Sequence, residues 1–432
     1  GTAVTLACGA TQTGFGRTGT VDWNTTPKTA TFTAVSGDGF FANTTGSAFN
    51  MNLPAGVAGA IVSVADYAGT WQTNALTVVP NGTDKIGSVN ENATLNTEGQ
   101  SVTFIFVDST QGWINTMDST SNVRGATNIA ATVSGACNTL VTAPCCANVK
   151  IATFTGPGTF CVSSISSTPA ENTVGYMVLA GGASGSRFAG VGGGGAGGFR
   201  EGRNVPIDNF TASPLVANAP TNAITLTVQG YPITVGAGGA VQGCSSSNGN
   251  DGSVSTFSTI TSAGGGGGAR SQGDPFGSSG AGNDGGSGGG NAFSSPSTVG
   301  AGNTPSVSPP QGNPGGRSNE ASGGPGNAGG GGGGAGGAGA KGSTSCGGNG
   351  GAGITTSINA TPTIRAGGGG GNANSGTSGT GGPGGGTAGT PYTGGAAATS
   401  AAANTGAGGG AGGNNSSGAG GSGIVIIRYK FQ

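Results

Sequence analysis

Residues 328–340 read AGGGGGGAGGAGA, and similar runs of glycine and alanine recur along the second half of the chain. They include GVGGGGAGG (190–198), AGGGGGA (263–269), AGGGGG (366–371) and GAGGGAGG (406–413). Of the 100 glycines in 432 residues, 20 lie in residues 1–180 and 80 in residues 181–432. Only 33% of the whole chain is hydrophobic, whereas roughly 45–50% of an ordinary globular protein is apolar. The second half therefore has too few apolar side chains to form an ordinary core.

Two structures are open to such runs. Tracts of Gly and Ser usually behave as flexible linkers, because glycine loses more conformational entropy on folding than any other residue. Alternatively, bare backbones pack side by side as left-handed extended helices with three residues per turn, the polyglycine II arrangement. Flexible linkers rarely repeat runs of similar length or finish in an apolar stretch such as IVIIRYKF (424–431). The sequence therefore favours a glycine-rich domain over residues 171–432, with polyglycine II-like packed helices and short β-strands.

The first part of the chain alternates apolar and polar residues at the period of a β-strand. The alternation covers KTATFTAV (28–35), AIVSVADY (60–67), NALTVVP (74–80) and SVTFIFVD (101–108), with turn-forming pairs between these stretches. Short strands at regular spacing, without a helical period, predict an antiparallel β-sandwich or barrel-like domain over residues 1–117. The whole chain is accordingly expected to be all-β.

Residues 118–170 are expected to form a Cys-containing connector, with a short β-hairpin at KIATFTGPGTFCV (150–162). Four of the seven cysteines fall here, at Cys137, Cys145, Cys146 and Cys161. We expect disulfides or buried thiols among them. The alternative is an irregular four-cysteine zinc site, which lacks the paired spacing of zinc ligands. Disulfides suit an extracellular location, and no metal or other cofactor is expected.

The charge and hydropathy of the chain exclude two classes of partner. The 14 Lys and Arg residues nearly balance 15 Asp and Glu residues, and no basic cluster is present to neutralise a run of phosphates. We therefore expect no nucleic-acid partner. The sequence has no stretch of about 18 consecutive apolar residues, so we expect no membrane insertion. The chain begins at Gly1 without Met, so we expect a processed product or part of a longer chain.

The residue types also argue against an enzyme. The chain contains no His, so neither a Ser-His-Asp arrangement nor a Cys-His pair can form, and its carboxylates occur singly. A glycosidase that uses two carboxylates is the remaining enzymatic alternative. GxGxxG matches inside the glycine runs carry no weight, because no strand-helix unit accompanies them.

The variable inserts between the glycine runs are the candidate receptor-binding loops. Small polar residues with occasional aromatics suit contacts with carbohydrate or protein surfaces. The residues we select are Asn248, Asp251, Arg270, Phe276, Phe293, Arg317 and Tyr392. A separate dense group is expected to close an edge of the glycine-rich domain: Arg187, Phe188, Phe199, Arg200, Glu201 and Arg203.

Three motifs in residues 39–116 are DYAGT (66–70), TLNTEGQSVTF (94–104) and VDSTQGW (107–113). Through them the segment resembles a domain of fibre and other structural proteins of marine bacteriophages, notably those that infect cyanobacteria. The second half resembles the glycine-rich domain of phage and giant-virus proteins through YMVLAGG (176–182), GGGGAGGFREG (192–202), ITVGAGG (233–239) and GGSGIVIIRY (420–429).

These resemblances imply a virion component on a tail or head surface, extracellular after release and associated with other virion proteins. The function they imply is a tail fibre or adhesin whose loops contact a host-surface polysaccharide or outer-membrane protein. Fibre symmetry favours a homotrimer. The alternative is a capsid decoration or an extracellular filament subunit, whose glycine-rich part spaces or self-assembles without binding a receptor.

Overall fold

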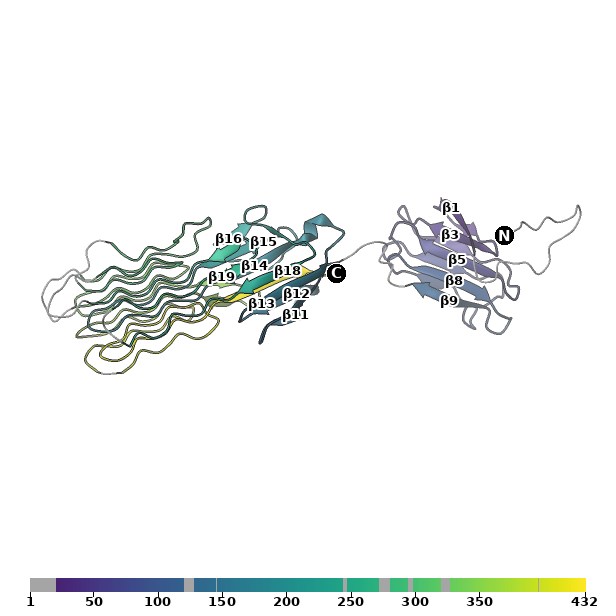
Figure 1. The fold of residues 1–432 in the computed structure, drawn as a ribbon. Helices are drawn as coiled ribbons and strands as arrows, with labels where there is room; N and C mark the ends of the chain where they lie inside the picture. The colour runs from purple at the N-terminus through teal and green to yellow at the C-terminus, as the bar shows by residue number, and fades with distance from the viewer. Residues whose placement is uncertain are drawn as a thin grey trace, which may run out of the picture. The chain divides into compact units, whose positions relative to one another are not determined.

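The computed structural model describes residues 21–119, 128–144, 146–243, 247–271, 280–293, 298–319, 327–394 and 396–432. The chain divides into two compact units, Gly1–Ala126 and Thr127–Gln432. Nearly all regular structure in the described residues is β-strand (Figure 1), and their helical part is one 3-10 turn, η1 (Pro169–Asn172). The all-β prediction is therefore confirmed.

The first unit contains two sheets that share one core. The larger sheet has the order β1 (Asp22–Lys28), β3 (Asp38–Ala42), β5 (Ile61–Asp66), β8 (Ser101–Phe106) and β9 (Trp113–Ser119). The smaller sheet has the order β2 (Phe32–Thr33), β4 (Phe49–Asn52), β6 (Leu76–Val79) and β7 (Ala93–Leu95). Side chains from both sheets enter one hydrophobic cluster, which includes the fully buried Trp71 and Trp113.

The predicted antiparallel arrangement of this unit is wrong for several strand pairs. Strands β1, β3 and β5 pair in parallel, and so do β2, β4 and β6. Strands β7, β8 and β9 join in antiparallel fashion. The cause is the path of the chain, which alternates between the two sheets from β1 to β6. Each strand therefore runs parallel to the previous strand of its own sheet.

The motif DYAGT ends strand β5 and fixes the loops around it. Asp66 is fully buried, and its carboxylate accepts hydrogen bonds from the backbone N–H groups of Gly69, Thr70, Trp71 and Gly99 at 3.0–3.2 Å. A buried carboxylate is costly unless such donors surround it. The motif DYAGT therefore has a structural explanation in this fold.

The β-part of the second unit also has two sheets. The larger has the order β11 (Thr139–Ala143), β12 (Cys146–Phe154), β23 (Ile424–Lys430), β14 (Thr173–Leu179), β15 (Phe199–Arg203) and β16 (Val216–Asn218), and β17 (Ile224–Thr225) pairs with β14. The smaller has the order β10 (Ala130–Val133), β13 (Gly158–Ser164), β18 (Gly230–Thr234), β19 (Ser255–Phe257) and β20 (Ile260–Ser262). Strands β21 (Ile354–Thr356) and β22 (Thr363–Arg365) form a separate pair.

Strand β23 lies inside the larger sheet, between β12 and β14. Val425 and Ile427 join the hydrophobic cluster that both sheets share, whereas Ile424 and Ile426 join a second cluster. Because both faces of the strand are buried, it reads as a continuous apolar run without alternation. The apolar end of the chain is thus explained by a central strand rather than an exposed one.

Residues 128–164 belong to this second unit and do not form a separate connector. Strands β12 and β13 do not pair with each other as the predicted hairpin requires, since β12 joins the larger sheet and β13 the smaller. The chain crosses between the sheets here because Phe154 and Phe160 both enter their shared cluster. The unit boundary falls after Ala126, whereas the sequence predicted boundaries after residues 117 and 170.

The glycine runs form extended segments that backbone hydrogen bonds join together. Along residues 192–198, consecutive N–H groups donate to three different neighbouring segments in turn. N–H groups that are three residues apart donate to the same segment. Residues 192, 195 and 198 donate to carbonyls in 263–269, residues 193 and 196 to carbonyls in 330–333, and residues 194 and 197 to carbonyls in 406–409. These N···O distances are 2.7–3.1 Å.

The carbonyl groups of the same segment accept from three further segments. Residues 192, 195 and 198 accept from 180–186, residues 193 and 196 from 287–290, and residue 194 from Gly369. Six neighbours therefore surround residues 192–198, and Figure 1 shows such segments running side by side away from the labelled strands. Residues 329–335 repeat the pattern. Their N–H groups donate in turn to carbonyls in 366–372, 288–291 and 337–340.

The spacing of these segments leaves no room for most side chains. A Cβ atom added to Gly194 would lie 2.3 Å from the carbonyl oxygen of Ala183, and one added to Gly332 would lie 2.0 Å from that of Gly194. Both distances are far below van der Waals contact. Glycine is therefore required because backbones approach one another, much as it is at the axis of collagen.

Candidate functional site

The glycine segments present a set of loops that we call the loop end, defined by residues 187–190, 374–378, 392–394 and 413–416. Loop 187–190 connects the segment that follows β14 to the segment that leads into β15, and loop 413–416 precedes the segment that leads into β23. The segments therefore carry these loops away from the strands, and Figure 1 shows the segments extending from the strands. Because the segments are bonded on several sides, they fix both ends of each loop.

Arg187 connects three parts of this end of the unit. Its Nη1 donates to the backbone oxygen of Gly243, and its Nη2 donates to that of Asn414 at 2.7 Å. An arginine suits this position because its planar fork of donors can reach two acceptors at once. Its role in the described structure is to hold neighbouring loops together.

Asn372 is fully buried, and sequence reasoning missed it. Its Oδ1 accepts from the backbone N–H of Val191 at 2.7 Å, and its Nδ2 donates to the oxygens of Phe188 and Gly412. The rings of Phe188 and Tyr392 then pack edge to face with centroids 5.2 Å apart. Its place in the sequence could have identified it, because Asn372 directly follows the run AGGGGG.

Asn248, Asp251 and Arg270, three of the predicted receptor-binding residues, meet around Asn283. The Nδ2 of Asn248 donates to Asn283 Oδ1 at 2.7 Å, and the Oδ1 of Asp251 accepts from Asn283 Nδ2 at 2.7 Å. Asn248 Oδ1 also accepts from the backbone N–H of Arg270 at 3.0 Å. These polar groups tie adjacent segments together, and the side chain of Asp251 remains exposed.

The remaining predicted receptor-binding residues differ in accessibility. Phe293 is 6% exposed and its backbone N–H bonds to Gly190, so its proposed role as a surface contact is wrong. Arg317 is exposed and Tyr392 is half-buried, whereas Phe276 lies outside the described residues.

The dense charged and aromatic group of the sequence is split between the two ends of the 192–198 segment. Arg187 and Phe188 belong to the loop end, and Phe199, Arg200, Glu201 and Arg203 belong to β15. Glu201 is 2% exposed, and its carboxylate accepts from the backbone N–H of Ser213 at 2.7 Å and from the hydroxyl of Thr356. Burial raises the pKa of this carboxyl group.

The predicted disulfides do not include Cys137 or Cys161, since both carry free, exposed thiols. Cys161 lies opposite Thr132 on β10 and Gly230 on β18, so no cysteine faces it across either strand pair. Cys145 lies outside the described residues. The Sγ of Cys146 lies 3.8 Å from Arg428 Nη2.

Arg428 is a buried cation that fastens two loops to β23. Its Nη2 donates to Asn209 Oδ1 at 3.2 Å, its Nη1 donates to the oxygen of Ile358, and its guanidinium lies 5.6 Å from the ring centre of Phe210. The neighbouring Asp208 has its pKa raised to about 6, chiefly because burial disfavours the charged form. These ionisable groups stabilise loop positions.

Within the described ranges, no three His, Cys, Asp or Glu side chains lie together as metal ligands would. The described part of the chain likewise includes no helix with the length and apolar character that crossing a membrane requires.

A family model described as a glycine-rich domain matches residues 155–430, which is more than half of the chain. The chain belongs to this glycine-rich domain family. The matched region begins at the crossing between β12 and β13 and runs through β23, so the glycine-rich domain includes both the strands and the bonded segments. This confirms the glycine-rich character predicted for the second half. No curated protein matches the chain significantly.

Proposed function

We propose that this chain is a non-enzymatic virion fibre or adhesin whose glycine-rich domain displays loops to a host surface. The observation that carries the proposal is the loop end, where several loops are anchored on bonded backbone segments. Loops held by a rigid scaffold are where binding residues usually lie, because their sequences can vary without loss of the core. The motifs shared with phage fibre proteins support the virion origin.

Packing of the segments as polyglycine II helices is part of the proposal. Its support is the hydrogen-bond period of three along residues 192–198 and 329–335, which matches three residues per turn. One backbone hydrogen bond contributes about 0.5–1.5 kcal/mol net. Rigidity therefore arises from the number of bonds rather than from an apolar core.

The accessible groups of the loop end suit a host-surface polysaccharide or an outer-membrane protein. Tyr392 offers a flat ring beside Phe188, and such rings provide contact area with little loss of conformational entropy. Outside these loops, Arg317 follows the bonded glycines Gly315 and Gly316 and adds an exposed guanidinium. These two side chains are accessible without being part of the bonded core.

Loop substitutions test the adhesin role better than deletion does. Removal of residues 176–432 would take β23 from β12 and β18 from β13, so the rest of the unit would unfold. Arg317→Ala combined with Tyr392→Ala leaves those pairs intact. Particles with this double variant are expected to adsorb to host cells at least tenfold less, whereas Val228→Ala, at a 60% exposed position near β18, adsorbs normally. Normal adsorption by the double variant, with the protein present and folded, contradicts the adhesin role.

A capsid decoration or filament subunit is the second candidate. Val141 is 51% exposed on β11, the edge strand of its sheet, and exposed edges favour pairing with another copy. Labelled protein separates the two functions: label at tail tips supports the fibre, and label spread over the head or along a polymer supports the alternative. Analytical ultracentrifugation of the purified chain tests the proposed trimer.

A further inference from the structure

The larger sheet of the first unit places one row of residues across its outer face. Its register aligns Trp23 with Gly39, Gly39 with Ser63, Ser63 with Thr103, and Thr103 with Met117. Residues directly opposite one another in a sheet point to the same face. The alternate residues of β5 and β8 fill the hydrophobic core, so this row lies on the face away from the core.

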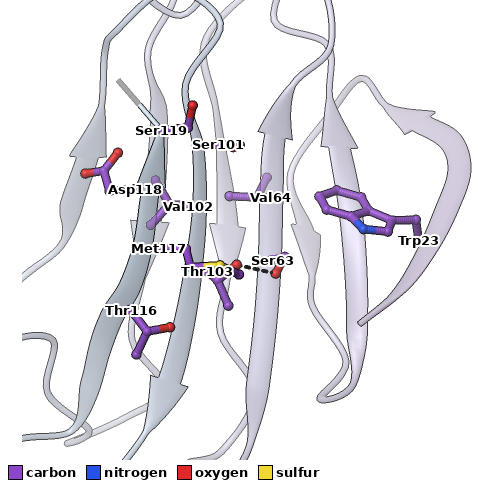
Figure 2. Close-up of a pocket in the computed structure, with 10 residues that line it drawn as sticks. All are labelled: Trp23, Ser63, Val64, Ser101, Val102, Thr103, Thr116, Met117, Asp118 and Ser119. Carbon is purple, nitrogen blue, oxygen red and sulfur yellow. Dashed lines mark hydrogen bonds between the residues drawn. The ribbon is translucent and has the colours of Figure 1, made fainter. Parts of the chain in front are cut away.

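The sizes of these side chains make the row a groove. Gly39, Ser63 and Thr103 in the middle are small, whereas Trp23 and Met117 at its two sides are large and 44% and 60% exposed. The groove has a volume of about 500 Å³. Figure 2 shows Trp23 on one side of the strands that carry Ser63 and Thr103, with Met117 and Asp118 on the other.

Trp23 is fixed as a platform at one side of the groove. A Cβ atom on Gly39 would lie 2.7 Å from the indole, so the absence of a side chain there lets the ring lie close to the sheet. The ring of Phe41 packs against it with centroids 4.9 Å apart. A flat, partly exposed indole can stack against the C–H face of a pyranose ring.

Polar groups lie beside this platform. Ser63 Oγ and Thr103 Oγ1 are 2.7 Å apart and nearly buried. Two hydroxyls share only one hydrogen bond, so one O–H hydrogen and several lone pairs remain for a ligand. These are acceptors and donors suited to sugar hydroxyls.

The net charge of the first unit favours one class of ligand for the groove over others. Residues 21–119 contain two lysines, no arginine and eight acidic residues, a formal charge of −6. This charge disfavours a polyanionic glycan and the same face of a second copy. A neutral sugar carries no such penalty. We infer that the groove binds a neutral carbohydrate, with a sugar ring on Trp23 and its hydroxyls bonded to Ser63 and Thr103.

This site belongs to the first unit, and it goes beyond the display function proposed for the loop end. The test is an array of neutral and acidic oligosaccharides probed with the full chain. A neutral glycan is expected to bind, Trp23→Ala to weaken that binding at least tenfold, and Thr103→Val, which removes one hydroxyl at nearly constant volume, to weaken it about threefold or more. Val57→Ala, at a 68% exposed position that does not line the groove, is expected to change nothing.

Fluorescence provides a second readout and a check on folding. Trp71 and Trp113 are fully buried, so acrylamide quenches Trp23 selectively, and the bound glycan should protect it. Binding only to acidic glycans, binding to none, or equal binding by the folded Trp23→Ala variant overturns the inference. Protection of Trp23 by self-association without glycan also overturns it. The double variant Arg317→Ala, Tyr392→Ala changes only the second unit and keeps the groove of the first unit. The glycan-binding proposal and the adhesin proposal can therefore fail independently of each other.

Discussion

Gly332→Ala is expected to destabilise the second unit by about 2–5 kcal/mol. The added methyl carbon would lie 2.0 Å from the carbonyl oxygen of Gly194 and 2.4 Å from its carbonyl carbon. Both atoms are backbone and belong to a segment bonded to six neighbours, so they cannot rotate away as a side chain would. Relief of the contact requires one segment to move by about 1 Å.

The magnitude follows from two costs and one smaller gain. Overpacking of a well-packed interior costs typically about 1–3 kcal/mol. The shift also weakens the bond from Gly332 N–H to Gly369 O at 2.8 Å and the bond from Gly351 N–H to Gly332 O at 2.9 Å, each worth about 0.5–1.5 kcal/mol. The lower entropy of the unfolded alanine chain returns about 0.4–1 kcal/mol.

Gly337→Ala is the matched control in the same glycine run. Its Cβ atom would have its nearest neighbour, the backbone nitrogen of Ala352, at 3.5 Å, which is ordinary contact. Its stability is expected to remain within about 0.5 kcal/mol of wild type, or to rise slightly, since nothing must move. The two substitutions share the same chemistry and differ in whether backbone lies in the way.

Denaturant unfolding read by two probes measures the difference. Trp23, Trp71 and Trp113 all lie in the first unit, so tryptophan fluorescence reports that unit and should be unchanged in both variants. Far-ultraviolet circular dichroism, which also follows the second unit, should show an earlier transition for Gly332→Ala alone. Equal stability of the two variants would refute the close approach of residues 332 and 194.

Three further predictions concern single groups. Asp66→Ala leaves four N–H donors unpaired, two of them buried, and should destabilise the first unit by about 3–5 kcal/mol, seen as an earlier fluorescence transition; an unchanged transition contradicts the role given to Asp66. The folded-state pKa of Asp208, about 6, lies above its ordinary value of 3.8, so its contribution to stability is present below about pH 4 and lost as the pH rises through 6. Asp208→Asn should therefore gain stability relative to wild type across this range, by at most about 3 kcal/mol, and a pH-independent difference would be inconsistent with the buried carboxyl group. Cys137 and Cys161 should both react with a maleimide in the native protein, and protection of either thiol would show that it is not free.

The elements that the sequence predicted well are those whose signal is local. Strands β5, β8 and β23 lie where alternation or an apolar run was read, because burial of one or both faces imposes that pattern on the strand itself. The glycine runs likewise correspond to the close-packed segments. In each case the residues that carry the signal are also the residues that make the contact.

The features that were missed depend on distant parts of the chain. Alternation shows which face of a strand is buried and contains no information on its partner, so the parallel pairs β1–β3 and β2–β4 were not predicted. The turn Gly156–Gly158 resembles a hairpin turn, yet it connects two sheets. Asn372 was overlooked because polar residues after a glycine run were interpreted as loop residues. Asn291, which follows GGSGGG and is also buried, suggests that this position is a usable signal.

Amide hydrogen exchange along residues 192–198 and 329–335 tests the central claim most directly, namely that bonded glycine backbones form a rigid core. Both segments are expected to be protected to a degree comparable with β23 (424–430), because each N–H has a distinct backbone acceptor. We also expect faster exchange in the loop residues 413–416. Exchange in the two glycine segments at the rate of an unstructured peptide would contradict the account.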